Sequence, residues 1–211
     1  MRVSRDQKFS EIMNMPVRMK HSVWLLLCLG LAMPALSQAA AEPRYTFGEI
    51  SYIHADYDNI DESGDGLGFG GSLAIHRNVH LLADYKDISL DGDNDASALS
   101  IGAGINYPLR SGLDVVGRLS YISAEIDRWG DDSEDGYGLE AGLRMMINPQ
   151  LELNGAIRYV DVFDDNTSLV LGGLYDVIPN LALGGELEFS DDYSALFLKA
   201  RYYFGSPVQM H

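Results

Sequence analysis

Three stretches of this chain share one formula: LDVVGRLSY at residues 113–121, LELNGAIRY at residues 151–159 and LALGGELEF at residues 181–189. In each, large apolar residues occupy every second position around a central glycine, and an aromatic residue ends the run. Alternation with period two is typical of a β-strand with one apolar and one polar face. About ten residues is also the length that a tilted strand needs to cross a bilayer. The formula therefore predicts transmembrane β-strands.

The same alternation recurs along the chain and predicts ten strands. We expect them at residues 45–55, 67–75, 80–88, 98–107, 113–123, 137–146, 151–160, 168–176, 181–190 and 193–204. Tight turns rich in Pro and Asn are expected at 76–78, 108–112, 147–150 and 177–180. Longer acidic connections are expected at 56–65, 90–95, 127–135 and 161–166, with a short one at 191–192. This alternation of connections predicts an all-β, antiparallel, up-and-down transmembrane β-barrel of about ten strands, with the acidic loops outside the cell.

The first 41 residues have the features of a secretory signal. Arg18 and Lys20 precede an apolar stretch at 23–36, and small residues follow it. We expect cleavage after Ala39 or Ala41, and a translation start at Met13, Met15 or Met19 is the alternative to one at Met1. This gives a signal peptide with a basic leader at 1–41, a barrel at 42–204 and a short tail at 205–211.

Charge and cysteine content exclude several classes of function. Without residues 1–41 the chain keeps ten Lys and Arg against twenty-nine Asp and Glu, and it loses its only cysteine. A strongly acidic chain repels the phosphates of nucleic acid, so no nucleic-acid partner is expected. Disulfide and thiol chemistry are not expected either.

Aromatic residues support the membrane interpretation. They lie near the ends of strands that run in opposite directions, so in a barrel they form one set at each end. Strands that run outward finish on an aromatic residue of the apolar face, and several inward strands do the same. The expected outer set is Tyr52, Tyr85, Tyr121, Tyr137, Tyr159 and Phe189, and the inner set is Tyr107, Tyr175, Tyr202 and Phe204. Such rings mark the two membrane interfaces.

The charged face of the strands is expected to line the lumen. A basic residue that faces lipid costs about 2–4 kcal/mol at the bilayer midplane, and the polar face carries six. We expect Glu140 to pair with Arg158, Arg144 with Glu152, and Glu186 and Glu188 with Lys199 and Arg201. Asp84, Lys86 and Arg118 should join this salt-bridged lumen. Separately hydrated charges in a wider pore are the alternative.

The signal peptide, the alternating strands and the aromatic end Tyr202-Tyr203-Phe204 resemble the small outer-membrane β-barrel proteins, the group with OmpX-type and porin-like barrels. The stretches 71–80 and 137–153 also resemble a ten-stranded subgroup. The resemblance implies the bacterial outer membrane as location, with lipid and lipopolysaccharide as partners. It also implies that residues 202–204 are read by the barrel-assembly machinery. The family normally ends on that aromatic residue, whereas seven residues follow here.

No catalytic residues and no organic cofactor are expected. Only His54, beside Asp56, is well placed near an outer rim, and a lone rim histidine is usually a surface residue. Weak Ca²⁺ or Mg²⁺ binding by the oxygen ligands of the acidic loops is the better-supported interpretation. The loops that begin at Asp61 and Asp91 are not EF-hands, because their twelfth positions hold Ser72 and Gly102 in place of glutamate. The candidate ligands are Asp61, Asp65, Asp91, Asp93, Asp95, Asp131, Asp132 and Asp135. The simpler interpretation is a set of solvated acidic loops.

Three functions remain open. The first is a non-enzymatic, monomeric surface protein whose acidic loops meet divalent cations, lipopolysaccharide or host molecules. The second is a narrow channel for small solutes, cation-preferring because its entrance is negative. The third is a secreted soluble barrel around an apolar ligand.

Overall fold

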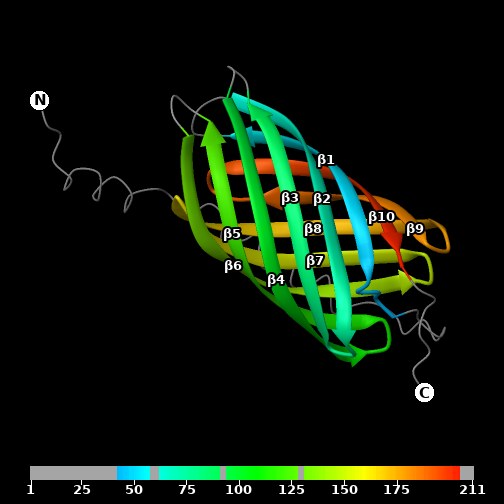
Figure 1. Ribbon diagram of the computed structural model, residues 1–211. Helices are drawn as coiled ribbons and strands as arrows, with labels where there is room; N and C mark the ends of the chain where they lie inside the picture. Colours follow the sequence, from blue (N-terminus) through cyan, green and yellow to red (C-terminus); the bar gives the residue numbers. More distant parts are fainter. Residues whose placement is uncertain (1–41, 58–61, 91–93, 128–130, 205–211) are drawn as a thin grey trace, which may run out of the picture. The chain divides into compact units, whose positions relative to one another are not determined.

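The computed structural model describes residues 42–57, 62–90, 94–127 and 131–204. These residues form ten antiparallel strands that close into a barrel (Figure 1). The strands are β1 (Phe47–Tyr57), β2 (Glu62–His76), β3 (Val79–Leu90), β4 (Asn94–Arg110), β5 (Leu113–Asp127), β6 (Asp131–Asn148), β7 (Leu151–Val162), β8 (Asp164–Ile178), β9 (Leu181–Phe189) and β10 (Tyr193–Tyr203). The predicted fold class is confirmed.

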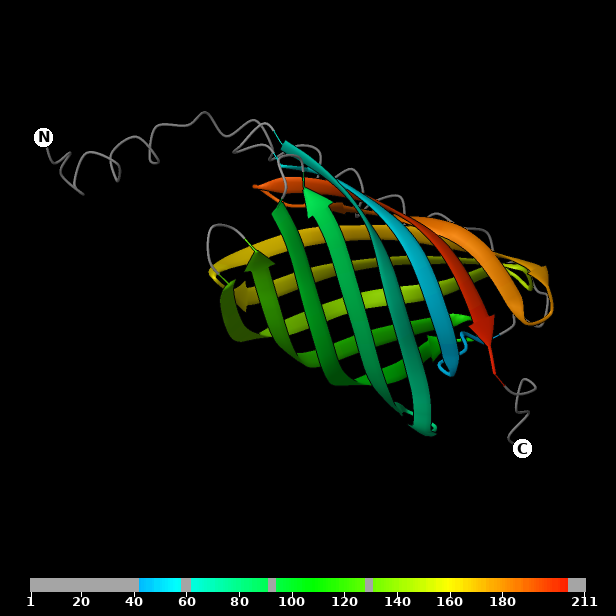
Figure 2. The same ribbon diagram turned by 45° about the horizontal axis from the view of Figure 1, so that its top comes forward.

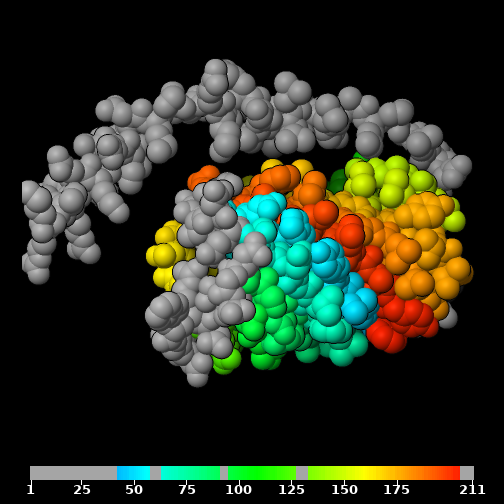
Figure 3. Space-filling view, turned by 90° about the horizontal axis from the view of Figure 1, so that it is seen from above, coloured from blue at the N-terminus to red at the C-terminus, as the bar shows by residue number. Residues whose placement is uncertain are grey.

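Each strand pairs with its sequence neighbours, and β1 pairs with β10 to close the cylinder. Figures 2 and 3 show the blue first strand beside the red last strand. Closure satisfies the edge groups of both terminal strands, which is the condition for a sheet to lie in lipid. No helix among the described residues is long and apolar enough to cross a membrane.

At one end of the barrel the connections are two-residue turns, at residues 77–78, 111–112, 149–150 and 179–180. In the second of these, Gly112 has a φ of 75°, a left-handed conformation that costs glycine no steric strain. Outer-membrane barrels have short turns on the periplasmic side, so we call this the periplasmic end and the opposite one the outer end.

The strands reach further at the outer end than the sequence predicts. The expected loop at 127–135 is largely strand, because β5 ends at Asp127 and β6 begins at Asp131. The loop expected at 161–166 is wrong, because β7 and β8 are separated by Phe163 alone, whose φ is 61°. Register pairing continues past the apolar stripe, since backbone hydrogen bonds do not depend on side-chain polarity.

Large apolar side chains cover the outside of the barrel. Leu119, Leu153 and Leu187 are exposed, whereas Arg144, Glu152 and Glu188 are buried inside. In water this pattern would leave an unfavourable apolar surface, and in a bilayer it places hydrocarbon against hydrocarbon. The two aromatic sets also lie on this surface at opposite ends of the strands, with Tyr121 and Tyr107 each more than half exposed.

Candidate functional site

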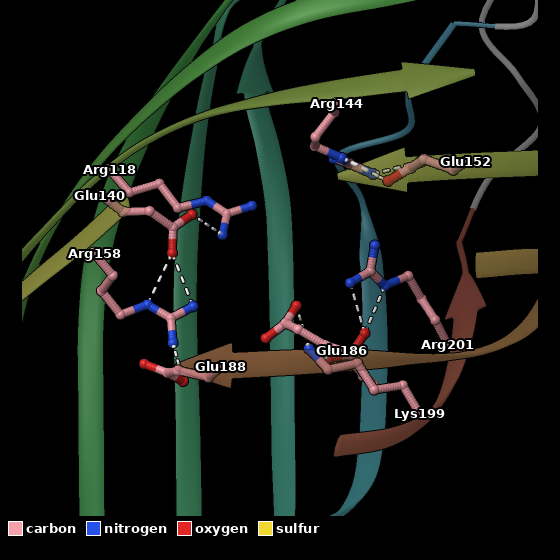
Figure 4. A network of polar contacts seen from close by, with 10 residues as sticks. Arg118, Glu140, Arg144, Glu152, Arg158, Glu186, Glu188, Lys199 and Arg201 are labelled. Carbon is pink, nitrogen blue, oxygen red and sulfur yellow. Dashed lines mark hydrogen bonds and ion pairs between the residues drawn. The ribbon is translucent and has the colours of Figure 1, made fainter. Parts of the chain in front are cut away.

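Two parts of the barrel concentrate charged side chains: the lumen and the outward surface at the outer end. In the lumen, one chain of alternating charges links residues of four strands, from Arg118 on β5 through Glu140 on β6 and Arg158 on β7 to Glu188 on β9 (Figure 4). The N–O distances between successive members are 2.8, 2.9 and 2.8 Å. Ser168 and Tyr193 donate further hydrogen bonds to Glu188. Each carboxylate is thus held by at least two donors.

A second chain runs along the wall where the barrel closes. Lys199 lies between Glu186 and Glu49, with Nζ–O distances of 3.0 and 3.3 Å, and Arg201 binds the same Glu49 at 2.6 Å. Deeper toward the periplasmic end, Arg144 forms a bidentate pair with Glu152 at 2.8 Å (Figure 4). Buried pairs of this kind mainly offset the cost of removing the charges from water.

The structure brings most of the predicted lumen residues together, with two changes of partner: Glu188 binds Arg158, and Arg201 binds Glu49. Glu140 stands directly opposite Arg158, and Glu152 lies diagonal to Arg144. The pairing of Glu188 with Lys199 or Arg201 is wrong, because Glu188 is opposite Ala195 and its carboxylate binds Arg158 instead. Asp84 and Lys86 line the same lumen, but neither forms an ion pair with another described residue.

The lumen encloses a cavity of about 160 Å³. Its lining includes every member of the two charged chains except Glu188, and also glycines of β2 such as Gly68 and Gly70, which have no side chain to fill the space. Side chains around its periplasmic side, including His80 and Val116, are fully or almost fully buried. Closely packed side chains therefore narrow the lumen on this side.

The second charged region lies outside the barrel, above the outer aromatic ring. Register pairing places eight carboxylates here on the outward face, and we call them the acidic collar. Its members are Asp56, Asp65, Asp87, Asp95, Glu125, Asp135, Asp161 and Asp165. Asp87 and Glu125 flank Ser97 on adjacent strands, so part of the collar is a continuous row. Among the described residues of this surface, no Lys or Arg interrupts it.

Among the described residues, His54 is the one nitrogen base at the collar. Its Nδ1 lies 2.8 Å from Asp65 and its Nε2 lies 3.6 Å from Asp56. The hydrogen bond to Asp65 raises the pKa of His54, and hydrogen bonds from Tyr52 and His54 lower the pKa of Asp65. The site is exposed to solvent, with His54 about two-fifths exposed and Asp65 more than half exposed.

The candidate metal ligands divide into three groups. Asp65, Asp95 and Asp135 belong to the collar. Asp61, Asp91 and Asp93 lie outside the described residues, and of Asp131 and Asp132 only the strand positions are described. The described side chains contain no preformed group of three metal ligands. The sequence analysis did not predict Glu49 of the lumen or Asp87 and Glu125 of the collar. Counting along each strand from its outward tyrosine assigns their faces, because an even separation keeps the outward face and an odd one gives the inward face.

Comparisons with solved structures agree with the fold. The chain resembles the COG4313 outer membrane channel from Pseudomonas putida F1, with a TM-score of 0.51 at 11% identity over 82% of this chain and 100% of that one. It also resembles the outer membrane protein OprG from Pseudomonas aeruginosa, with a TM-score of 0.45, 11% identity, and 79% and 99% of the two chains covered. A KdgM porin in complex with disordered oligogalacturonate matches with a TM-score of 0.45 at 10% identity, over 74% and 99%.

At 11% identity the channel from Pseudomonas putida F1 supports the fold alone. No curated protein sequence matches the chain significantly. A protein-family model matches most of the chain, and not only the three repeated strand motifs. Residues 23–204 match the model described as the outer membrane protein beta-barrel domain, and the chain therefore belongs to that family of the bacterial outer membrane.

Proposed function

We propose that this protein is a non-enzymatic outer-membrane surface barrel whose acidic collar binds divalent cations and, through them, the phosphates of lipopolysaccharide. The observation that carries the proposal is the collar itself: eight outward carboxylates directly above an aromatic ring, with no Lys or Arg among the described residues between them. Aromatic rings mark the depth of the lipid headgroups, so the collar lies at the level of charged lipid groups.

Electrostatics requires a third component at such a surface. Carboxylates and phosphates at the same depth repel each other, and the repulsion is stronger near a low-dielectric membrane than in bulk water. Ca²⁺ and Mg²⁺ accept several oxygen ligands from different molecules. A cation shared between a collar carboxylate and a lipid phosphate converts the repulsion into a bridge. Because the described carboxylates form no preformed triad, lipid oxygens would complete the coordination.

A narrow channel is the competing function, and the lumen cavity is the observation that favours it. Two features support the surface role instead. The lumen charges are neutralised in the alternating chains described above rather than left free for solutes. The side chains on the periplasmic side of the cavity are also buried, which leaves little room there for water.

The test compares two variants that lose the same charges at the same end of the barrel. The collar variant is Asp87→Asn, Asp95→Asn, Glu125→Gln, and the control is Asp164→Asn, Asp191→Asn, Glu134→Gln. The control residues lie on inward positions or in the β9–β10 connection. Refolded proteins are titrated with Ca²⁺ by calorimetry, and their binding to lipopolysaccharide micelles is measured with Ca²⁺ and with chelator.

We expect weak Ca²⁺ sites, with Kd of about 10⁻⁴–10⁻³ M, and Ca²⁺-dependent lipopolysaccharide binding. Both should fall in the collar variant and persist in the control. Equal losses in the two variants would show that bulk acidity rather than the collar is responsible. Binding to lipopolysaccharide that chelator leaves unchanged would also refute the bridge.

A further inference from the structure

The residues just before β1 do not continue the barrel wall. The described chain begins at Glu42, and β1 begins at Phe47, so residues 42–46 lie outside the strand ladder. Pro43 is buried, and Tyr45 is only 8% exposed. A segment that precedes a membrane strand would be solvated if it extended into the periplasm. Its burial places it in the periplasmic mouth of the barrel.

Arg44 attaches this segment to the β8–β9 side of the mouth. Its Nη2 binds Asp176 of β8 at 2.5 Å, and its Nη1 donates to the carbonyl oxygen of Pro179 at 2.7 Å. The same guanidinium lies over the ring of Tyr203 on β10, with 3.5 Å between its Cζ and the ring centroid. Three separate contacts therefore hold one side chain against this wall.

Tyr45 attaches the segment to other walls of the mouth. Its hydroxyl donates to Asp114 of β5 at 2.8 Å, and its ring stacks on His80 of β3 with 4.8 Å between centroids. The guanidinium of Arg144 on β6 also lies over the Tyr45 ring, with 4.5 Å between its Cζ and the ring centroid. It donates a hydrogen bond to the carbonyl oxygen of Arg44 at 3.2 Å. Residues 44 and 45 thus connect strands β3, β5, β6, β8 and β10 across the opening.

The cavity ends where this segment begins. His80 and Arg144 touch Tyr45, and both also line the cavity from its periplasmic side. The segment is held chiefly by side chains, with few backbone bonds, such as that from the Phe204 amide to Thr46. Side-chain attachment allows the segment to leave without breaking the barrel ladder, which β1 and β10 complete from Phe47 onward.

We propose that residues 42–46 form a displaceable plug, and that its departure from the periplasmic mouth opens the lumen to small hydrated ions. The plug acts at the opposite end of the barrel from the acidic collar, so this inference does not depend on the proposed function. Lipopolysaccharide bridging can fail while gating is observed, and the reverse is equally possible.

The test is conductance in planar bilayers, with the refolded barrel beginning at Glu42. The plug variant Arg44→Ala, Tyr45→Ala removes the side-chain contacts and leaves the strands unchanged. We expect the parent protein to be closed for most of the recording and the variant to show stable conductance steps, with open probability raised at least tenfold. Tyr45→Phe keeps the stacking on His80 and loses only the hydroxyl, so it should lie between them. Arg110→Ala, an exposed change at the same end, should match the parent.

Two results would overturn the plug. One is a plug variant that refolds, judged by its heat-dependent gel shift, but conducts no more than the parent. The other is a parent protein that already conducts at the level of the variant. Should the double variant fail to refold, maleimide labelling of Tyr45→Cys decides the matter in an otherwise cysteine-free chain. Labelling is slow for a docked plug and should accelerate when Asp114→Asn is added; labelling that is fast from the start contradicts docking.

Discussion

The lumen and the acidic collar use the same carboxylate chemistry with opposite arrangements. In the lumen, Glu49, Glu140 and Glu152 each lie within hydrogen-bond distance of a guanidinium. At the collar, the ion-pair partner found among the described residues is His54, which serves Asp56 and Asp65. The two regions lie on opposite faces of the same strands, so the alternation of side chains assigns them.

The difference shows where this chain tolerates unbalanced charge. An unpaired charge inside a narrow barrel loses its hydration, and only an opposite charge compensates. An unpaired charge above the aromatic ring keeps its water and can recruit a cation. The carboxylates of the collar are therefore placed where they keep their hydration, whereas those of the lumen depend on ion pairs.

The largest expected difference between lumen and collar comes from removing the partner of a buried lumen charge. Glu152→Ala leaves Arg144 buried without its bidentate partner, and we expect a loss of about 3–5 kcal/mol of unfolding free energy. Denaturant titration of the barrel in vesicles measures it. Asp65→Ala, at the exposed collar, should cost far less. The double change Glu152→Leu, Arg144→Met should recover much of the loss, and a single variant as stable as the parent would contradict the buried pair.

A second test moves one charge along the outward face of β5. Leu119 lies in the middle of the lipid-facing stripe, and Glu125 lies in the collar three outward positions further on. Leu119→Arg should lower stability by about 2–4 kcal/mol, and Glu125→Arg by about 0–1 kcal/mol. The same denaturant titration measures both. Equal costs would mean that the collar lies within the hydrocarbon or that the stripe does not face lipid.

Much of the lumen can be predicted from sequence because hairpins fix the register. A two-residue turn at 149–150 sets Glu140 opposite Arg158, and period-two alternation turns both inward. Glu49 escaped prediction because its partners, Lys199 and Arg201, are about 150 positions away, across the closing pair of strands. The pattern that predicts a closed barrel also implies that first-strand and last-strand residues face each other.

The plug of residues 42–46 and the length of the strands at the outer end are harder to predict from sequence. Arg44 and Tyr45 follow the expected signal sequence and resemble an irregular start of the first strand. Contacts between a short segment and five strands have no periodic signature in the sequence. At the outer end, polar runs such as 131–136 resemble loops, since alternation disappears when both faces are wet. Local pattern thus identifies the membrane-spanning part and fails beyond it.

A smaller effect distinguishes the crowded lumen wall from the lipid face. A Cβ at Gly184, which points inward, would lie 1.9 Å from the carbonyl oxygen of Gly173, whereas one at outward Gly71 would find its nearest neighbour at 3.4 Å. Gly184→Ala therefore forces the backbone to move and should cost about 1–3 kcal/mol. Gly71→Ala should change stability by less than about 0.5 kcal/mol. Thermal unfolding of the two variants measures the difference, and similar melting temperatures would refute it.

The smallest expected effect tests the electrostatics of the collar by pH. The pKa of His54 is raised in the folded barrel by its hydrogen bond to Asp65, so its contribution to stability is complete below the unfolded pKa of about 6.5. That contribution is lost as pH rises through the higher folded value. The Tm of the parent relative to His54→Gln should therefore be higher at about pH 5.5 than at about pH 8.5. The exposure of the pair keeps the shift small, and added Ca²⁺ should reduce it further by competing for Asp56 and Asp65. A difference in Tm that does not change with pH would mean that His54 and Asp65 are not coupled, and that the collar behaves as independent solvated charges.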